Sequence, residues 1–184
     1  MKMIFTLTYD GELKANGEAK HKQKIRRLFH GQLRELWKAT PYEQLKSPPE
    51  SVTQTRGKFR FFPLVTAARN EIAELKITML RPGQGPGYII GQGGDIDNRL
   101  KTLFDSLKIP DSNQIPPEDQ PVDDENPFFC LLEDDILITD LLISTDRLLE
   151  PCKSNSHVKL IVRVEIKNMP RIGAAMISTL GWSR

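Results

Sequence analysis

The residues in this sequence best suited to chemistry are carboxylates that fall in two short segments. Asp95 and Asp97 follow a pair of glycines and precede Lys101, and a second group, Glu133-Asp134-Asp135, interrupts an apolar run. Carboxylate oxygens are the ligands that Mg²⁺ prefers, with water and phosphate oxygens completing its shell. If the two segments meet, they would hold a cation able to assist displacement at a phosphodiester, with the positive charge of Lys101 near the phosphate.

Each segment also has a purely structural interpretation. One aspartate before a helix can cap its free N–H groups, and Asp97, Lys101 and Asp105 recur at a spacing that gives stabilising charge pairs. Capping accounts for one aspartate but not for two alternate aspartates followed by Asn98. The acids at 133–135 could instead be exposed by a bulge or turn at a sheet edge, because burying them without a partner or a cation is costly.

The hydrophobic pattern predicts the elements that must position these residues. Period-2 and β-branched patterns indicate strands at 3–9, 58–66, 71–80 and 157–167, and three- and four-residue steps indicate helices at 18–39 and about 98–107. The apolar segment 128–143 predicts a buried strand or a hairpin. The glycine-rich stretch 83–94 lacks the P-loop pattern and predicts a flexible connection.

Length and composition bound the class of protein. With 184 residues and a hydrophobic fraction of 39%, the chain is expected to form one domain with a real core. No apolar run is long enough to cross a bilayer, and Cys130 and Cys152 are too few for a disulfide scaffold, so a cytoplasmic protein is expected. The histidines show no metal-ligand spacing with these cysteines, and Cys130 is expected to be a buried structural thiol.

The formal net charge of +2 conceals a strong asymmetry. Residues 1–81 carry a net charge of +8, whereas residues 109–150 carry −11. The segment 109–127, rich in proline and acids, predicts a surface loop insertion that either folds away from a polyanion or gates its access. Basic residues that could contact DNA phosphates are Lys20, Lys24, Arg27, Arg34, Arg56, Lys58 and Arg60. A solvated surface explains the basic helix equally well, and core packing of Phe59, Phe61 and Phe62 is favoured over base stacking.

These motifs together resemble the RusA family of Holliday junction resolvases. The resemblance rests on Asp95-Ile96-Asp97-Asn98-Arg99-Leu100-Lys101, the continuation Phe104-Asp105-Ser106-Leu107 and the later Asp134-Asp135, and it covers about residues 70–167. It implies a single RusA-like nuclease domain over residues 1–184, of the α+β class, with one small mixed sheet, flanking helices and the acidic insertion at 109–127.

The resemblance also implies a function and a set of roles. Asp95, Asp97 and Asp135 would bind Mg²⁺ or Mn²⁺, Lys101 would assist catalysis, and Asn98 and Asp134 would support them. The expected activity is metal-dependent cleavage of branched DNA such as Holliday junctions by a homodimer, in recombination or repair. Two alternatives stay open, namely a non-catalytic nucleic-acid-binding module on the same fold and, less favoured, a nucleotide-sugar transferase.

Overall fold

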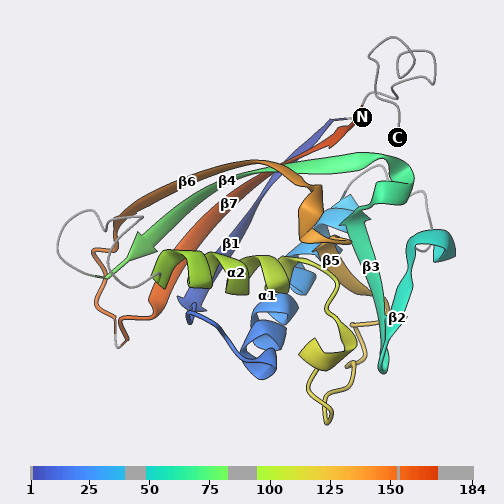
Figure 1. Cartoon of the computed structure of the whole chain (residues 1–184), viewed down its shortest axis with the longest axis horizontal. Helices are drawn as coiled ribbons and strands as arrows, with labels where there is room; N and C mark the ends of the chain where they lie inside the picture. The colour runs from blue at the N-terminus through green and yellow to red at the C-terminus, as the bar shows by residue number, and fades with distance from the viewer. Residues whose placement is uncertain (1, 40–48, 83–94, 153, 170–184) are drawn as a thin grey trace, which may run out of the picture.

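The computed structural model describes residues 2–39, 49–82, 95–152 and 154–169, which form an α+β fold with two sheets (Figure 1). The elements in chain order are β1 (Met3–Glu12), α1 (Ala19–Ala39), η2 (Glu50–Val52), β2 (Gln54–Arg56), β3 (Phe59–Val65), η3 (Ala67–Arg69), β4 (Glu71–Arg81), α2 (Asp95–Leu107), η4 (Ser112–Gln114), β5 (Phe128–Leu132), η5 (Asp135–Leu137), β6 (Ile138–Arg147) and β7 (His157–Asn168). The predicted α+β class is confirmed, with the strands divided between two sheets rather than gathered in one. The predicted connection at 83–94 lies outside the described residues.

The larger sheet has the strand order β1-β7-β4-β6 and is mixed, because β6 runs parallel to β4 while the other neighbours are antiparallel. In β4 every second residue from Glu71 to Met79 is buried, so the strand predicted at 71–80 has one buried face and one more exposed face. The two helices cover one face of this sheet, and no described helix covers the other (Figure 1).

The smaller sheet has the order β2-β3-β5, with β3 and β5 parallel. The segment 128–143 is therefore not a hairpin, since β5 belongs to this sheet and β6 to the larger one. Five consecutive residues of β5 are buried, which is typical of a strand covered on both faces.

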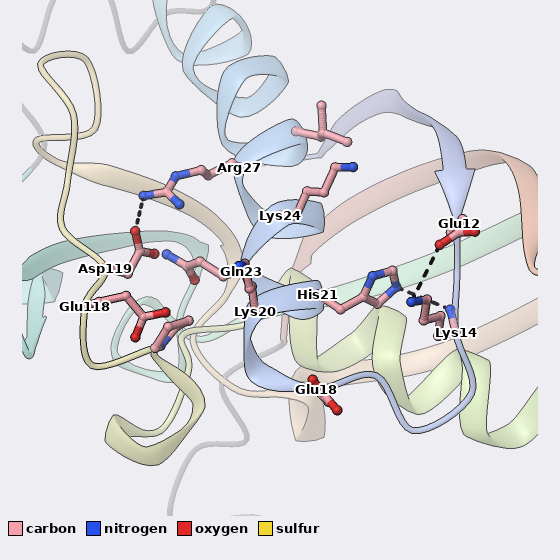
Figure 2. Close-up of a pocket in the computed structure, with 12 residues that line it drawn as sticks. Glu12, Lys14, Glu18, Lys20, His21, Gln23, Lys24, Arg27, Glu118 and Asp119 are labelled. Atoms are coloured by element: carbon pink, nitrogen blue, oxygen red, sulfur yellow. Dashed lines mark hydrogen bonds and ion pairs between the residues drawn. The ribbon is translucent and has the colours of Figure 1, made fainter.

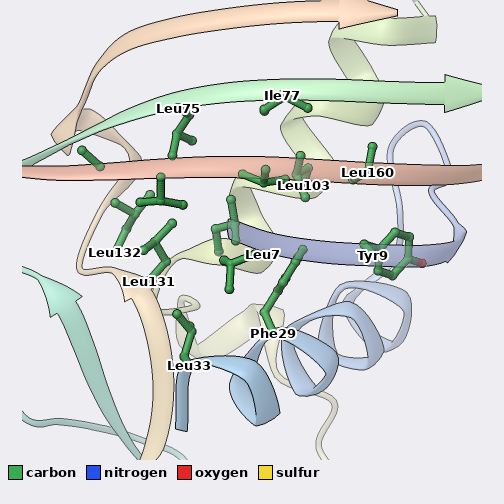
Figure 3. Close-up of a cluster of buried hydrophobic side chains, with 14 of the residues drawn as sticks. Leu7, Tyr9, Phe29, Leu33, Leu75, Ile77, Leu103, Leu131, Leu132 and Leu160 are labelled. Carbon is green, nitrogen blue, oxygen red and sulfur yellow. The ribbon is translucent and has the colours of Figure 1, made fainter. Parts of the chain in front are cut away.

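The main core lies between the larger sheet and α1, where Leu7, Phe29, Leu33, Leu75 and Leu160 meet (Figure 3). A smaller cluster surrounds Cys130 in the smaller sheet. Phe59, Phe61 and Phe62 are all fully buried, so core packing of these rings is confirmed and base stacking by them is excluded. Burial raises the pKa of the Cys130 thiol to about 12, which makes it the structural thiol that the sequence predicted.

The acidic segment 109–127 is an ordered loop that packs on α1. His30 of that helix is buried, its Nε2 lies 3.1 Å from the carbonyl oxygen of Asp124, and its Nδ1 accepts a hydrogen bond from the Phe129 N–H at 2.8 Å. An acceptor at Nδ1 requires the proton to be on Nε2, so the neutral ring joins the loop and β5 to the helix.

This histidine predicts a loss of stability in mild acid. Burial lowers the pKa of His30, so the folded chain binds fewer protons than the unfolded chain, and stability falls as the pH drops below about 6.5. We expect His30→Gln, whose amide can donate and accept at similar positions but does not titrate, to lose less free energy of unfolding between pH 7.5 and pH 5.5 than the wild type. Urea denaturation at the two pH values measures this, and an equal loss in both proteins would contradict it.

Candidate functional site

Helix α2 begins at Asp95, slightly earlier than its apolar pattern predicted. Its buried stripe faces the core and consists of Ile96, Leu100, Leu103 and Leu107. Two aspartates in the first turn suit the partial positive charge at a helix N-terminus. The sequence thus favours a helix that starts at the Asp-x-Asp motif.

A tight junction with α1 fixes α2 in place. The N–H of Gly17, just before α1, donates to the Thr102 hydroxyl oxygen at 2.9 Å. A Cβ at this glycine would lie 2.8 Å from the Thr102 methyl carbon and 2.8 Å from a carbon of the His21 ring, so the close approach requires glycine. Lys22 Nζ lies 2.6 Å from the Asp105 carboxylate, and both side chains are largely buried.

Asp97 and Lys101 project from the opposite, exposed side of α2. Neither side chain has a hydrogen bond or ion pair among the described residues, although both are charged and lie one turn apart. Asn98, between them, is half-buried, and its carbonyl oxygen accepts from the Thr102 hydroxyl. Asp95 begins the helix, but its side chain lies outside the described part of the structure.

The second acidic group forms a turn between β5 and β6. Glu133 accepts from the Gln54 amide at 2.9 Å and from the Ala67 N–H at 3.0 Å, which joins the end of β5 to β2 and to η3. Asp134 caps η5 by accepting from the Ile136 N–H at 3.0 Å. These contacts confirm the turn that the sequence left open as an alternative.

Asp135 forms an ion pair with Lys108, the residue that follows α2. The Nζ–Oδ1 distance is 2.8 Å. Burial raises the pKa of Asp135, but the hydrogen bond and charge of Lys108 outweigh burial and lower this pKa overall. The pKa of Lys108 is raised for the reciprocal reason, since the attraction of Asp135 exceeds the cost of burying the ammonium group.

The structure does not bring Asp97 and Asp135 together within one chain. Asp97 lies in the first turn of α2, while Asp135 contacts Lys108 beyond its last turn, and Figure 1 shows β5 and the chain that follows it at the far end of the helix from Asp95. At 1.5 Å per residue the backbones at 97 and 108 are about 16 Å apart along the axis. Two oxygens bound to one Mg²⁺ lie within about 4 Å of each other. In the described ranges no group of three or more histidine, cysteine or acidic side chains is placed to hold a metal ion.

The acidic loop neutralises part of the basic helix. Arg27 contacts Asp119 at 2.9 Å (Figure 2) and Glu125 at 2.8 Å, and Arg34 forms an ion pair with Asp124. The loop therefore folds onto α1 and pairs with two of its arginines.

Two lysines of the same helix are not neutralised in this way. Lys20 and Lys24 are exposed and have no ion pair among the described residues. Together with Lys14, Arg27 and Asp119 they line a hollow of about 760 Å³ beside the first half of α1 (Figure 2).

The remaining basic residues predicted to contact DNA lie around β2 and β3. Arg56 donates to the Gln54 amide oxygen at 2.8 Å, Arg60 forms an ion pair with Glu50, and Lys58 is exposed in the turn between the strands. Lys58 is therefore the most accessible cation of this group. DNA contact by these side chains stays a prediction.

Sequence reasoning missed the partners that hold the candidate acids. Lys108 stands seven residues after Lys101, which places both lysines on the same helical face. This spacing could have predicted that Lys108 lies close to the exposed side of α2. No comparable signal pointed to Gln54 and the Ala67 N–H as partners of Glu133, because strand pairing between distant segments brings them together.

Comparisons with known proteins add no relative. No family model matches the chain, and no curated protein or solved structure is significantly similar to it. Among the described helices, none is long and apolar enough to cross a membrane.

Charged residues on the buried and exposed sides of α2 should differ in how much they contribute to the stability of the fold. Asp105→Asn leaves the Lys22 ammonium largely buried without its carboxylate, so we expect the free energy of unfolding to fall by about 2–3 kcal/mol. Lys101→Met, one turn earlier on the exposed side, should change it by less than about 0.5 kcal/mol. Urea denaturation of both variants tests this, and equal losses would mean that Asp105 does not anchor the helix.

Proposed function

We propose that this chain is a metal-dependent, structure-selective DNA endonuclease whose site lies at the N-terminal end of α2. One observation carries the proposal. Asp97 and Lys101 are exposed and unpartnered among the described residues, while Asp105, Glu133, Asp134 and Asp135 all have partners within the protein. A carboxylate and an ammonium group that the fold does not use remain available to a ligand.

The donor set fits a hard divalent cation. Mg²⁺ is commonly held by only one or two carboxylates, with water and phosphate oxygens completing its octahedral shell, and Asp95 and Asp97 would supply those two. When bound there, Mg²⁺ would lower the pKa of water and stabilise negative charge on the phosphodiester. Lys101 would neutralise charge on the same phosphate, and Asn98 would orient the start of the helix.

The role of Asp135 follows from its position. Its carboxylate lies beside the opposite end of α2 and is held by Lys108. As a metal ligand it would have to exchange Lys108 for the cation and approach Asp97. The proposal therefore places the first two metal ligands at Asp95 and Asp97. The contribution of Asp135 to activity distinguishes a site at the start of α2 alone from a site in which Asp135 binds the same ion.

A non-catalytic DNA-binding module is the second candidate. The observation that favours it is that Asp135, one of the expected metal ligands, is instead held by Lys108 at 2.8 Å. Such a module would bind branched DNA through its basic residues but would cut it with no divalent ion. Both candidates place the protein in the cytoplasm with branched DNA as partner, and both are compatible with a homodimer.

A cleavage assay distinguishes the candidates. With Mg²⁺ or Mn²⁺, we expect the wild type to cut four-way and forked DNA in preference to linear duplex. Asp97→Asn and Lys101→Met should each lower the rate at least about 100-fold, because one removes a ligand and the other the charge near the phosphate. Asp105→Glu serves as the matched control, because it changes a carboxylate on the same helix whose partner, Lys22, lies within the protein.

The outcomes are distinct. Full activity of Asp97→Asn would contradict the catalytic proposal. Binding of branched DNA without cleavage by the wild type would favour the non-catalytic DNA-binding module. Loss of activity in Asp135→Asn equal to that in Asp97→Asn would show that both ends of α2 serve one ion.

The exposed lysines of α1 predict a salt-dependent contribution to DNA binding. Lys20→Gln with Lys24→Gln removes two cations that have no ion pair among the described residues, so the slope of log affinity against log salt should become less steep by about 2. Arg34→Gln is the control, because this arginine is already paired with Asp124 and should change the slope by less. Fluorescence anisotropy with labelled duplex measures both, and an unchanged slope in the double variant would place the DNA elsewhere.

A further inference from the structure

The face of the larger sheet that no described helix covers carries two cations side by side (Figure 1). The β4–β7 register places Arg163 directly opposite Lys76, and the residues that flank them in each strand are buried on the other face. Both side chains are exposed, and neither has an ion pair or hydrogen bond among the described residues. Like charges directly opposite each other destabilise a sheet, so the fold gains nothing from this cation pair.

The next row of the same face shows how the fold treats a like-charge pair that it neutralises. Glu74 lies opposite Glu165 in the same register. Lys167 contacts Glu74 at 2.7 Å and Glu165 at 3.0 Å, and Lys2 contacts Glu165 at 2.9 Å. Two lysines therefore compensate these two acids, whereas no described acid contacts the cation pair beside them.

The surroundings of the cation pair suit a phosphate group. Thr6 lies opposite Arg163 on β1, and Thr78 lies two residues beyond Lys76 on the same face of β4, so two hydroxyl groups flank the two cations. Arginine, lysine and hydroxyl side chains are the usual donors to phosphate oxygens. The strands carry no aromatic side chain on this face, so a nucleic acid would be contacted here through its backbone and not by base stacking.

We propose that the cation pair binds the phosphate backbone of one arm of a branched DNA, while another arm lies on the helix-covered side of the protein. This contact rests on the proposed nuclease function, because that function brings branched DNA to the chain. The exposed Lys20, Lys24 and Asp97 belong to the two helices that cover the opposite face of the sheet (Figure 1). A polyanion is the partner that complements uncompensated cations on both faces.

Contact on two faces gives a physical basis for preferring branched DNA. The sheet and a layer of helices about 10 Å thick separate the cation pair from the exposed lysines of α1. Duplex DNA has a persistence length of about 150 bp, so a short linear duplex is nearly straight and reaches one face at a time. Arms that diverge from a branch point can lie along both faces at once.

Binding measured without divalent metal ions tests this contact, because cleavage does not then intervene. The double variant Arg163→Gln with Lys76→Gln should bind a labelled four-way junction about 10-fold more weakly, and the slope of log affinity against log salt should become less steep by about 2. Its affinity for a linear duplex of the same sequence should change by less than about 2-fold, since a straight duplex is held by the helix side alone. Fluorescence anisotropy over a range of salt concentrations measures both.

Lys167→Gln is the matched control, because Lys167 is a cation on the same face of β7 that two glutamates already neutralise. It should weaken binding to the junction by less than about 3-fold. The midpoint of urea denaturation of the double variant should not fall, because the substitutions remove a like-charge pair. A loss of DNA binding in that variant is then not a loss of folded protein.

The outcomes separate this contact from the proposed function. A wild type that binds neither DNA contradicts both. A wild type that binds and cuts the junction, with a double variant that binds it equally well, overturns only the contact on the outer face and leaves the cation pair to an acidic protein partner. Equal losses for junction and linear duplex overturn the assignment of the two faces to separate arms.

Discussion

The junction between α1 and α2 is the constraint on which the rest of the structure depends. Arg26 is only 1% exposed, and burial lowers its pKa, so its guanidinium must be held by acceptors inside the protein. It donates to the carbonyl oxygen of Asp105 at 2.7 Å and to the side chain of Gln23, while Lys22 binds the Asp105 carboxylate. A single residue of α2 thus receives two cations from α1. Because losing these bonds would leave further buried groups without partners, the two helices have little freedom to slide, and the direction in which the first turn of α2 points is fixed.

The acidic loop acts on the same helix from the other side. Its carboxylates contact Arg27 and Arg34, and His30 binds its backbone, so the strongly negative segment is folded against the strongly positive one. The small net charge of the chain reflects this local compensation and not a weakly charged surface. Lys20 and Lys24 take no part in these ion pairs, so the accessible positive charge lies toward the start of α1. This end of the helix packs on α2 through Gly17. The accessible positive charge of α1 therefore depends on which cations the loop leaves exposed.

The parts of the fold that the sequence predicted are those governed by local patterns. The alternation at 157–167 and the helical steps at 18–39 and after Asp97 each report a face that must be buried, and β7, α1 and α2 follow them. The short strand β2 was missed because three residues carry too little periodicity. The division of 128–143 between two sheets was missed because it depends on which distant strands pair, as in the contact of Glu133 with Ala67. For the site, residue types indicated the chemistry, but the distance between Asp97 and Asp135 is set by the length of α2 and the path of the chain after it, which composition does not encode.

Buried polar groups in a protein are nearly always hydrogen-bonded, so the partners of each acid show which acids the fold uses. Here the carboxylates with described side chains on α2 and η5 fall into two kinds: Asp105 and Asp135 are held by lysines, whereas Asp97 is not. At the β1 edge of the larger sheet, the Gln32 amide occupies the hydrogen-bonding positions of a neighbouring strand. Phe104 places the exposed side of α2 next to Asp135 and the first residues of β6. Asp105 and Asp135 therefore serve the fold, whereas the exposed Asp97 carboxylate is accessible to groups outside the chain.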